Sequence, residues 1–142
     1  MEKSLILKEM FLNEFGLEEQ DIRTYSPLTL AYIGDAIFEL VVRTVLVERK
    51  NTQAEKLHKA ATKIVKAETQ ALMIEALKEE LTEEELAVYK RGRNAKAVTR
   101  AKNATMSEYR RATGFEALMG YLYLTGQMHR AQMLYKLSLI KE

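Results

Sequence analysis

The spacing of apolar residues predicts helices along most of the chain. Residues 4–15 carry apolar side chains every three or four positions, and Gly16 can end that helix. Ser26 followed by Pro27 favours a second helix start, with the serine as the N-cap. Residues 27–49 then predict one long helix whose first half is apolar on nearly all sides.

Two Thr-x-x-Glu sequences, beginning at Thr52 and Thr82, fit capping boxes at further helix starts. They predict helices over residues 52–66 and from Thr82 to about Arg91. Residues 67–80 continue the helical pattern between them.

The periodicity is lost over residues 92–106, which predict a polar, basic loop. Ser107 can cap the next helix, which runs to Thr125, and Gly126 can end it. Residues 127–141 predict a last amphipathic helix.

The whole pattern predicts an all-α fold of six or seven helices in a single domain spanning residues 1–142. The absence of cysteine excludes disulfides, thiolate zinc sites and cysteine nucleophiles, and it fits a reducing cytoplasm. The two histidines, His58 and His129, are too far apart to suggest a zinc site. We expect no membrane segment, because no apolar run approaches the roughly 20 uncharged residues that a span needs.

Acidic residues occur in the two most apolar stretches of the chain. Between residues 26 and 42 the only charges are Asp35 and Glu39, and between residues 112 and 126 the only charge is Glu116. Both stretches should therefore lie in the core or at an interface. A buried carboxylate is costly without a partner, so each of these acids needs one.

Two kinds of partner are open for these acids. An ion pair with an arginine is the commoner explanation, and Arg43 and Arg111 are candidates. The alternative is a divalent cation shared by the two helices, for which Mg²⁺ is the natural choice because only oxygen ligands are at hand. Glu39 lies one turn after Asp35 and is either a second ligand or, as we favour, a structural neighbour of the ligands.

A basic stretch with two amides follows residue 89. Its composition suits contacts with the phosphates of a duplex, although a solvated surface loop is the commoner origin of a charge run. No aromatic residue occurs from residue 90 to residue 108, so stacking on single-stranded bases is not indicated. The candidate RNA-binding side chains are Lys90, Arg91, Arg93, Asn94, Lys96, Arg100 and Lys102.

Two motifs resemble those of the ribonuclease III endonuclease domain. Residues 30–39 (LAYIGDAIFE) look like its signature helix, and residues 115–120 (FEALMG) look like its second acidic motif. Ordinary members carry two further acids where this chain has Ala31 and Thr113. That departure, the stretch KRGRNA at residues 90–95 and the lack of a double-stranded-RNA-binding domain resemble the short bacterial branch called Mini-ribonuclease III.

The resemblance implies a cytoplasmic all-α homodimer that hydrolyses double-stranded RNA with Mg²⁺, or with Mn²⁺ in its place. In the short branch the substrate is the 23S ribosomal RNA precursor, with a ribosomal protein on the precursor as a further partner. Asp35 and Glu116 match the family's metal-binding catalytic acids, and we expect Glu39 and Thr113 to support them. With the other two acids missing, either one metal ion or two remains open.

Two other functions are compatible with the residues. A catalytically inactive RNA-binding module with the same fold is favoured by Ala31 and Thr113 and opposed by the retention of Asp35 and Glu116. A helical adaptor would bury its charge-poor helices against another protein and would ignore duplex RNA.

Overall fold

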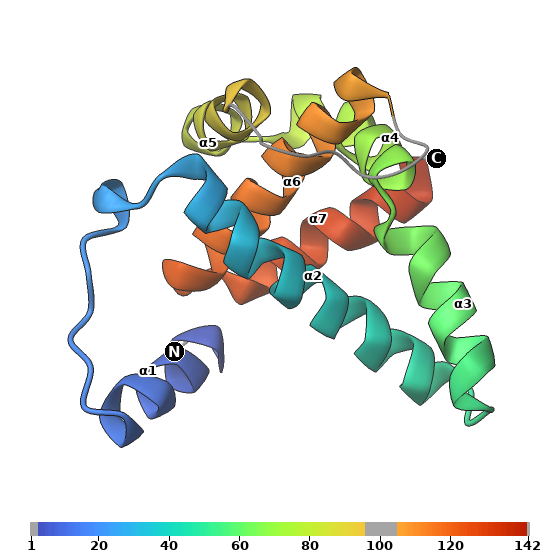
Figure 1. The fold of residues 1–142 in the computed structure, drawn as a ribbon, viewed down its shortest axis with the longest axis horizontal. Coiled ribbons are helices and arrows are strands. Elements are labelled where there is room, and N and C mark those ends of the chain that lie inside the picture. The colour runs from blue at the N-terminus through green and yellow to red at the C-terminus, as the bar shows by residue number, and fades with distance from the viewer. Residues whose placement is uncertain (1–2, 96–104, 142) are drawn as a thin grey trace.

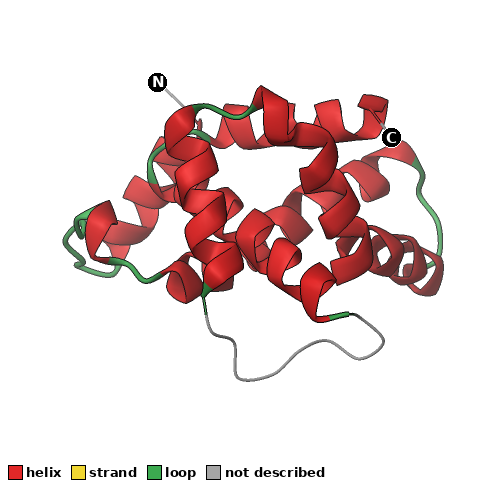
Figure 2. Cartoon of the chain, turned by 90° about the horizontal axis from the view of Figure 1, so that it is seen from above, coloured by secondary structure: helices red, strands yellow, loops and turns green. Residues whose placement is uncertain are grey.

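The computed structural model describes residues 3–95 and 105–141, which form helices joined by short turns (Figures 1 and 2). These ranges hold seven α-helices and no strand, so the predicted all-α class is confirmed. None of the described helices combines the length and the apolar character needed to cross a membrane. The elements are α1 (Lys3–Glu14), η1 (Ile22–Thr24), α2 (Pro27–Arg49), α3 (Ala54–Val65), α4 (Ala67–Leu77), η2 (Lys78–Glu80), α5 (Glu83–Asn94), α6 (Met106–Leu124) and α7 (Met128–Lys141), where η marks a short 3-10 turn.

Helix α6 is the centre of the fold and packs against α2, α4, α5 and α7. Figure 1 shows α2, in blue to teal, crossing the orange α6. Helix α3 packs against the C-terminal end of α2. Every residue of α6 from Ala112 to Tyr123 is buried except Glu116. Phe115 of α6 meets Phe38 of α2 edge to face, with ring centroids 5.0 Å apart. Glu116 is thus an acid in an otherwise apolar segment, as the sequence predicts.

The predicted ends of several helices are confirmed. The backbone N–H of Thr29 donates to Ser26 Oγ over 3.1 Å, which caps α2 directly before Pro27. Thr82 opens α5 with both hydrogen bonds of a capping box. Gly16 and Gly126 follow α1 and α6 with φ angles of 62° and 75°, a conformation that glycine adopts without strain.

Two predicted caps are wrong. Helix α3 begins at Ala54 with Gln53 as its N-cap and without a side-chain cap, so Thr52 lies one position too early. Helix α6 begins at Met106, because Thr105 forms a complete capping box with Glu108 and leaves Ser107 inside the first turn.

Two predicted boundaries also change. The helix expected over residues 67–80 ends at Leu77 and continues as the 3-10 turn η2. The expected loop over residues 92–106 begins later, because α5 continues to Asn94. Gly92 is held in α5 by tertiary packing, since a methyl group there would lie only 2.8 Å from the Cβ of Ala117 in α6. That close approach of α5 to α6 outweighs the weak helix propensity of glycine.

Candidate active site

Two glycines bring the backbones of α2 and α6 into direct contact. A methyl group on Gly34 of α2 would overlap the carbonyl group of Glu116, and one on Gly120 of α6 would overlap the carbonyl group of Leu30. Only glycine leaves room for such an approach. Because Asp35 follows Gly34 directly, this crossing places the carboxyl groups of Asp35 and Glu116 beside each other.

The two acids line an open cleft of about 450 Å³ between α2 and α6. Asp35 is exposed there and Glu116 is partly buried, so of the two expected settings, the core or an interface, the core is wrong for Asp35. The reason is that the buried residues of α2 occupy its opposite side, against α6. Other residues that line the cleft are Glu39, Thr113, Tyr109 and Ala31.

The electrostatics of the cleft are set by crowded carboxyl groups. The pKa of Glu116 is raised to about 8, chiefly by burial and next by Asp35, which acts through its charge and through a hydrogen bond. The charge of Glu39 acts in the same direction, whereas the amide of Gln70 lowers the pKa. A cation bound between these acids would stabilise their charged forms.

Of the two arginines expected as ion-pair partners, Arg43 pairs with one of the expected acids, Glu39, whereas Arg111 pairs with Glu75. Arg43 Nη2 lies 3.0 Å from Glu39 Oε1, and Arg111 Nη1 lies 3.4 Å from Glu75 Oε1. Within the residues that the structure describes, no basic side chain forms an ion pair with Asp35 or Glu116. Arg43 and Arg111 are therefore not the partners of Asp35 and Glu116, whereas the predicted ion pair with an arginine is confirmed for Glu39.

The donor set fits a hard divalent cation. Asp35 and Glu116 supply carboxylate oxygens in an open cleft, and Mg²⁺ commonly takes one or two carboxylates and keeps several waters. Over residues 3–95 and 105–141 no group of three or more acids or histidines gathers in a way that would hold a metal. The cleft therefore offers two carboxylates to such a cation, and water would have to complete its coordination.

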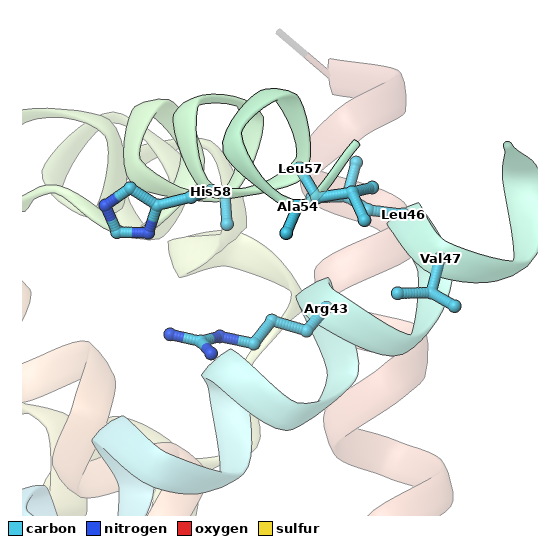
Figure 3. A pocket seen from close by; sticks show the side chains of 7 residues that line it. Arg43, Leu46, Val47, Ala54, Leu57 and His58 are labelled. Atoms are coloured by element: carbon cyan, nitrogen blue, oxygen red, sulfur yellow. The ribbon is translucent and has the colours of Figure 1, made fainter. Parts of the chain in front are cut away.

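Glu39 and Thr113 both lie at the cleft, as expected, but each already has a partner. Glu39 is held by Arg43, and the hydroxyl of Thr113 donates to the carbonyl of Tyr109 over 3.0 Å. Arg43 itself projects into a second, smaller groove between α2 and α3, where Figure 3 shows its side chain and that of His58 on the same open side. No acid lines that groove, so it offers no competing metal site.

One side chain at the site was not predicted. Gln70 of α4 is buried and donates from Nε2 to Glu116 Oε2 over 3.5 Å. The available signal was a glutamine directly before the apolar run at residues 71–74. That signal is weak, because nothing in the local sequence shows that α4 packs on α6.

The described part of the basic stretch lies at the C-terminal end of α5. Lys90, Arg91 and Asn94 are exposed. Arg93 is partly buried, with its guanidinium 5.7 Å from the centre of the Tyr89 ring. The remaining predicted RNA-binding residues, which lie outside the described residues, are Lys96, Arg100 and Lys102.

Comparison with known proteins gives consistent matches over most of the chain. The Ribonuclease III domain family matches residues 28–127. Mini-ribonuclease 3 of Clostridium tetani is 45% identical over 132 residues, which cover 92% of this chain and 87% of that protein. Mini-ribonuclease 3 of Thermoanaerobacter sp. is 43% identical over 138 residues, covering 97% and 96%. The crystal structure of protein FN1578 from Fusobacterium nucleatum has a TM-score of 0.76 and 32% identity, covering 87% of this chain and 99% of that one.

Proposed function

This chain belongs to the ribonuclease III domain family and is an endoribonuclease of double-stranded RNA, and we propose that Asp35 and Glu116 are the acids with which it cuts. The observation that carries the proposal is the glycine-mediated crossing of α2 and α6. It holds two carboxyl groups side by side in an open cleft, and no described basic side chain pairs with either.

Asp35 and Glu116 would hold Mg²⁺, or Mn²⁺ in its place, in this cleft. Such an ion would supply a Lewis acid, which would lower the pKa of a coordinated water and stabilise charge on the phosphate oxygens. Glu116 must lose its proton to serve as a ligand, because its pKa without metal is about 8. Asp35 is exposed at the cleft, where an incoming strand would meet it. Hydrolysis would leave 5′-phosphate and 3′-hydroxyl ends.

Glu39 and Thr113 would keep the cleft in shape. Glu39 is fixed by Arg43, which prevents it from turning freely toward the two acids. The hydroxyl of Thr113 donates to the backbone carbonyl one turn earlier, which would fix the orientation of this side chain beside Glu116.

The substrate that we propose is the 23S ribosomal RNA precursor. We further propose that the chain forms a single catalytic domain and acts in the cytoplasm. The relatives compared above carry the name Mini-ribonuclease 3, the branch for which the sequence resemblance implies this substrate. The family typically acts as a dimer, and two exposed apolar side chains of α2 would suit a homodimer contact: Tyr32 is 82% exposed and Leu40 is 51% exposed. A two-fold dimer would present one cleft to each strand of a duplex.

The test is cleavage of a labelled duplex from the 23S precursor, with Mg²⁺ or with EDTA. We expect Asp35→Asn to lower the cleavage rate at least about 100-fold, because the neutral amide is a poor ligand for Mg²⁺. Its matched control is Asp21→Asn, which makes the same change at the exposed N-cap of η1, where asparagine also caps well. Cleavage by Asp35→Asn at the rate of the control would refute the assignment. If the wild-type protein bound the duplex but did not cut it with any divalent metal, the inactive RNA-binding module would be favoured.

A further inference from the structure

Gln70 is a buried amide in contact with one of the two acids. Its side chain is 1% exposed, and Nε2 lies 2.8 Å from the carbonyl oxygen of Val65 and 3.5 Å from Glu116 Oε2. The Val65 carbonyl can only accept a hydrogen bond, so it fixes which end of the amide faces it. The same NH₂ group therefore points its second hydrogen toward Glu116.

This orientation leaves the other end of the amide unsatisfied. Gln70 Oε1 is buried and has no hydrogen-bond partner within the described residues. Such an atom costs about 1–3 kcal/mol of stability. A methionine would fill nearly the same space without that cost. Packing alone therefore does not account for a glutamine at this position.

The contacts of Gln70 connect three elements at the cleft. Val65 is the last residue of α3, Gln70 stands in the first turn of α4, and Glu116 lies in the middle of α6. The neighbouring side chains that line the cleft at Ala31 and Thr113 carry no carboxyl group, and the Thr113 hydroxyl donates to the backbone. Gln70 is thus the described side chain that donates a hydrogen bond to the Glu116 carboxyl group.

We propose that Gln70 is a positioning residue, which holds the Glu116 carboxylate in the orientation in which it binds a divalent cation together with Asp35. The inference rests on the proposed function, because it assigns Gln70 to the same site. The Val65 carbonyl anchors the amide, and the amide restrains the rotation of the Glu116 side chain. A carboxylate that is already oriented loses less conformational freedom when the metal binds.

The test measures Mn²⁺ binding to the full chain without RNA, from the electron paramagnetic resonance signal of the free ion. We expect Gln70→Met to weaken Mn²⁺ binding about 10-fold, while its thermal unfolding shows that the fold is kept. Gln70→Asn should weaken binding as well, because its amide is one methylene too short to reach Glu116. The matched control is Ser138→Ala, which removes a buried hydrogen bond of α7 away from the cleft and should bind Mn²⁺ as the wild type does.

A second readout separates positioning from stability. The Mg²⁺ concentration for half-maximal cleavage should rise about 10-fold in Gln70→Met, while the rate at saturating Mg²⁺ falls much less. Wild-type Mn²⁺ affinity in both Gln70 variants would overturn the inference. If Gln70→Met does not fold, Gln70→Asn decides.

Asp35→Asn in the same binding assay keeps the two proposals apart. Loss of Mn²⁺ binding in Asp35→Asn together with unchanged binding in the Gln70 variants overturns the role of Gln70 alone. Unchanged binding in Asp35→Asn overturns the metal site itself, and the role of Gln70 with it.

Discussion

Glu116 carries an electrostatic cost that a bound metal would relieve. Burial and the neighbouring Asp35 raise its pKa from 4.5 to about 8 in the folded chain. Between these two pH values the folded state therefore binds more protons than the unfolded state. The stability of the metal-free protein should fall as the pH rises through this window, and the full penalty is present above pH 8.

Glu116→Gln should remove this dependence on pH. In EDTA we expect its melting temperature to match the wild type near pH 4.5 and to exceed it by at least about 3 °C above pH 8. Mg²⁺ should then raise the melting temperature of the wild type only. Melting curves followed by circular dichroism measure both effects. A difference between the two proteins that stays constant from pH 4.5 to 9 would show that folding does not raise the pKa of Glu116.

The residues of the site were predictable to different degrees. Asp35 and Glu116 stand out because each is an acid in an apolar stretch, a local signal that survives in the fold. Gln70 does not stand out, because its contact with Glu116 joins residues 46 positions apart. The exposure of Asp35 was also missed, since an apolar sequence does not say which side of the helix meets α6.

At the scale of elements, local sequence signals predicted where helices occur, but they predicted only some of the helix ends correctly. The start of α2 follows from Ser26 and Pro27, whose effects act within one turn. The sequence indicated Ser107 as the cap of α6, but Thr105, which has a glutamate three residues later, forms it. The C-terminal end of α5 depends on packing of Gly92 against α6, which the local sequence does not contain.

The crossing of α2 and α6 should be sensitive to a single methyl group. Gly34→Ala would force the methyl group into the backbone of Glu116, so the helices must separate. We expect a loss of about 3 kcal/mol of unfolding free energy, together with loss of cleavage, as the two acids move apart. Gly16→Ala is the comparison, since it meets no atom within 4 Å and strains only a positive φ, at about 1 kcal/mol. Urea unfolding measures both, and equal losses would contradict the crossing.

At the scale of the whole molecule, the acidic cleft needs cationic surface nearby to hold a polyanion. The net charge of +2 is too small to do this by itself, so the local distribution has to provide the attraction. The exposed end of α5 offers Lys90 and Arg91 for this purpose. Each cation that meets a phosphate releases counterions, which makes binding depend on salt.

Replacing Lys90 and Arg91 by glutamine should weaken duplex RNA binding and reduce the slope of log affinity against log salt by about 1–2. The matched control replaces Lys50 and Lys136 by glutamine, which removes two exposed positive charges away from α5. Fluorescence anisotropy at several salt concentrations measures the slope. Equal slopes in the two double variants would mean that the end of α5 makes no specific contact with the RNA.

The central claim, that Asp35 and Glu116 act as one metal site, is tested most directly by a double-mutant cycle on cleavage. The rates to measure are those of the wild type, Asp35→Asn, Glu116→Gln and the double variant, at saturating RNA and fixed Mg²⁺. Residues that act as a unit give losses that do not multiply. The account predicts that the double variant is no slower than the slower single variant. Losses that multiply, or a single variant that still cuts at the wild-type rate, would contradict it.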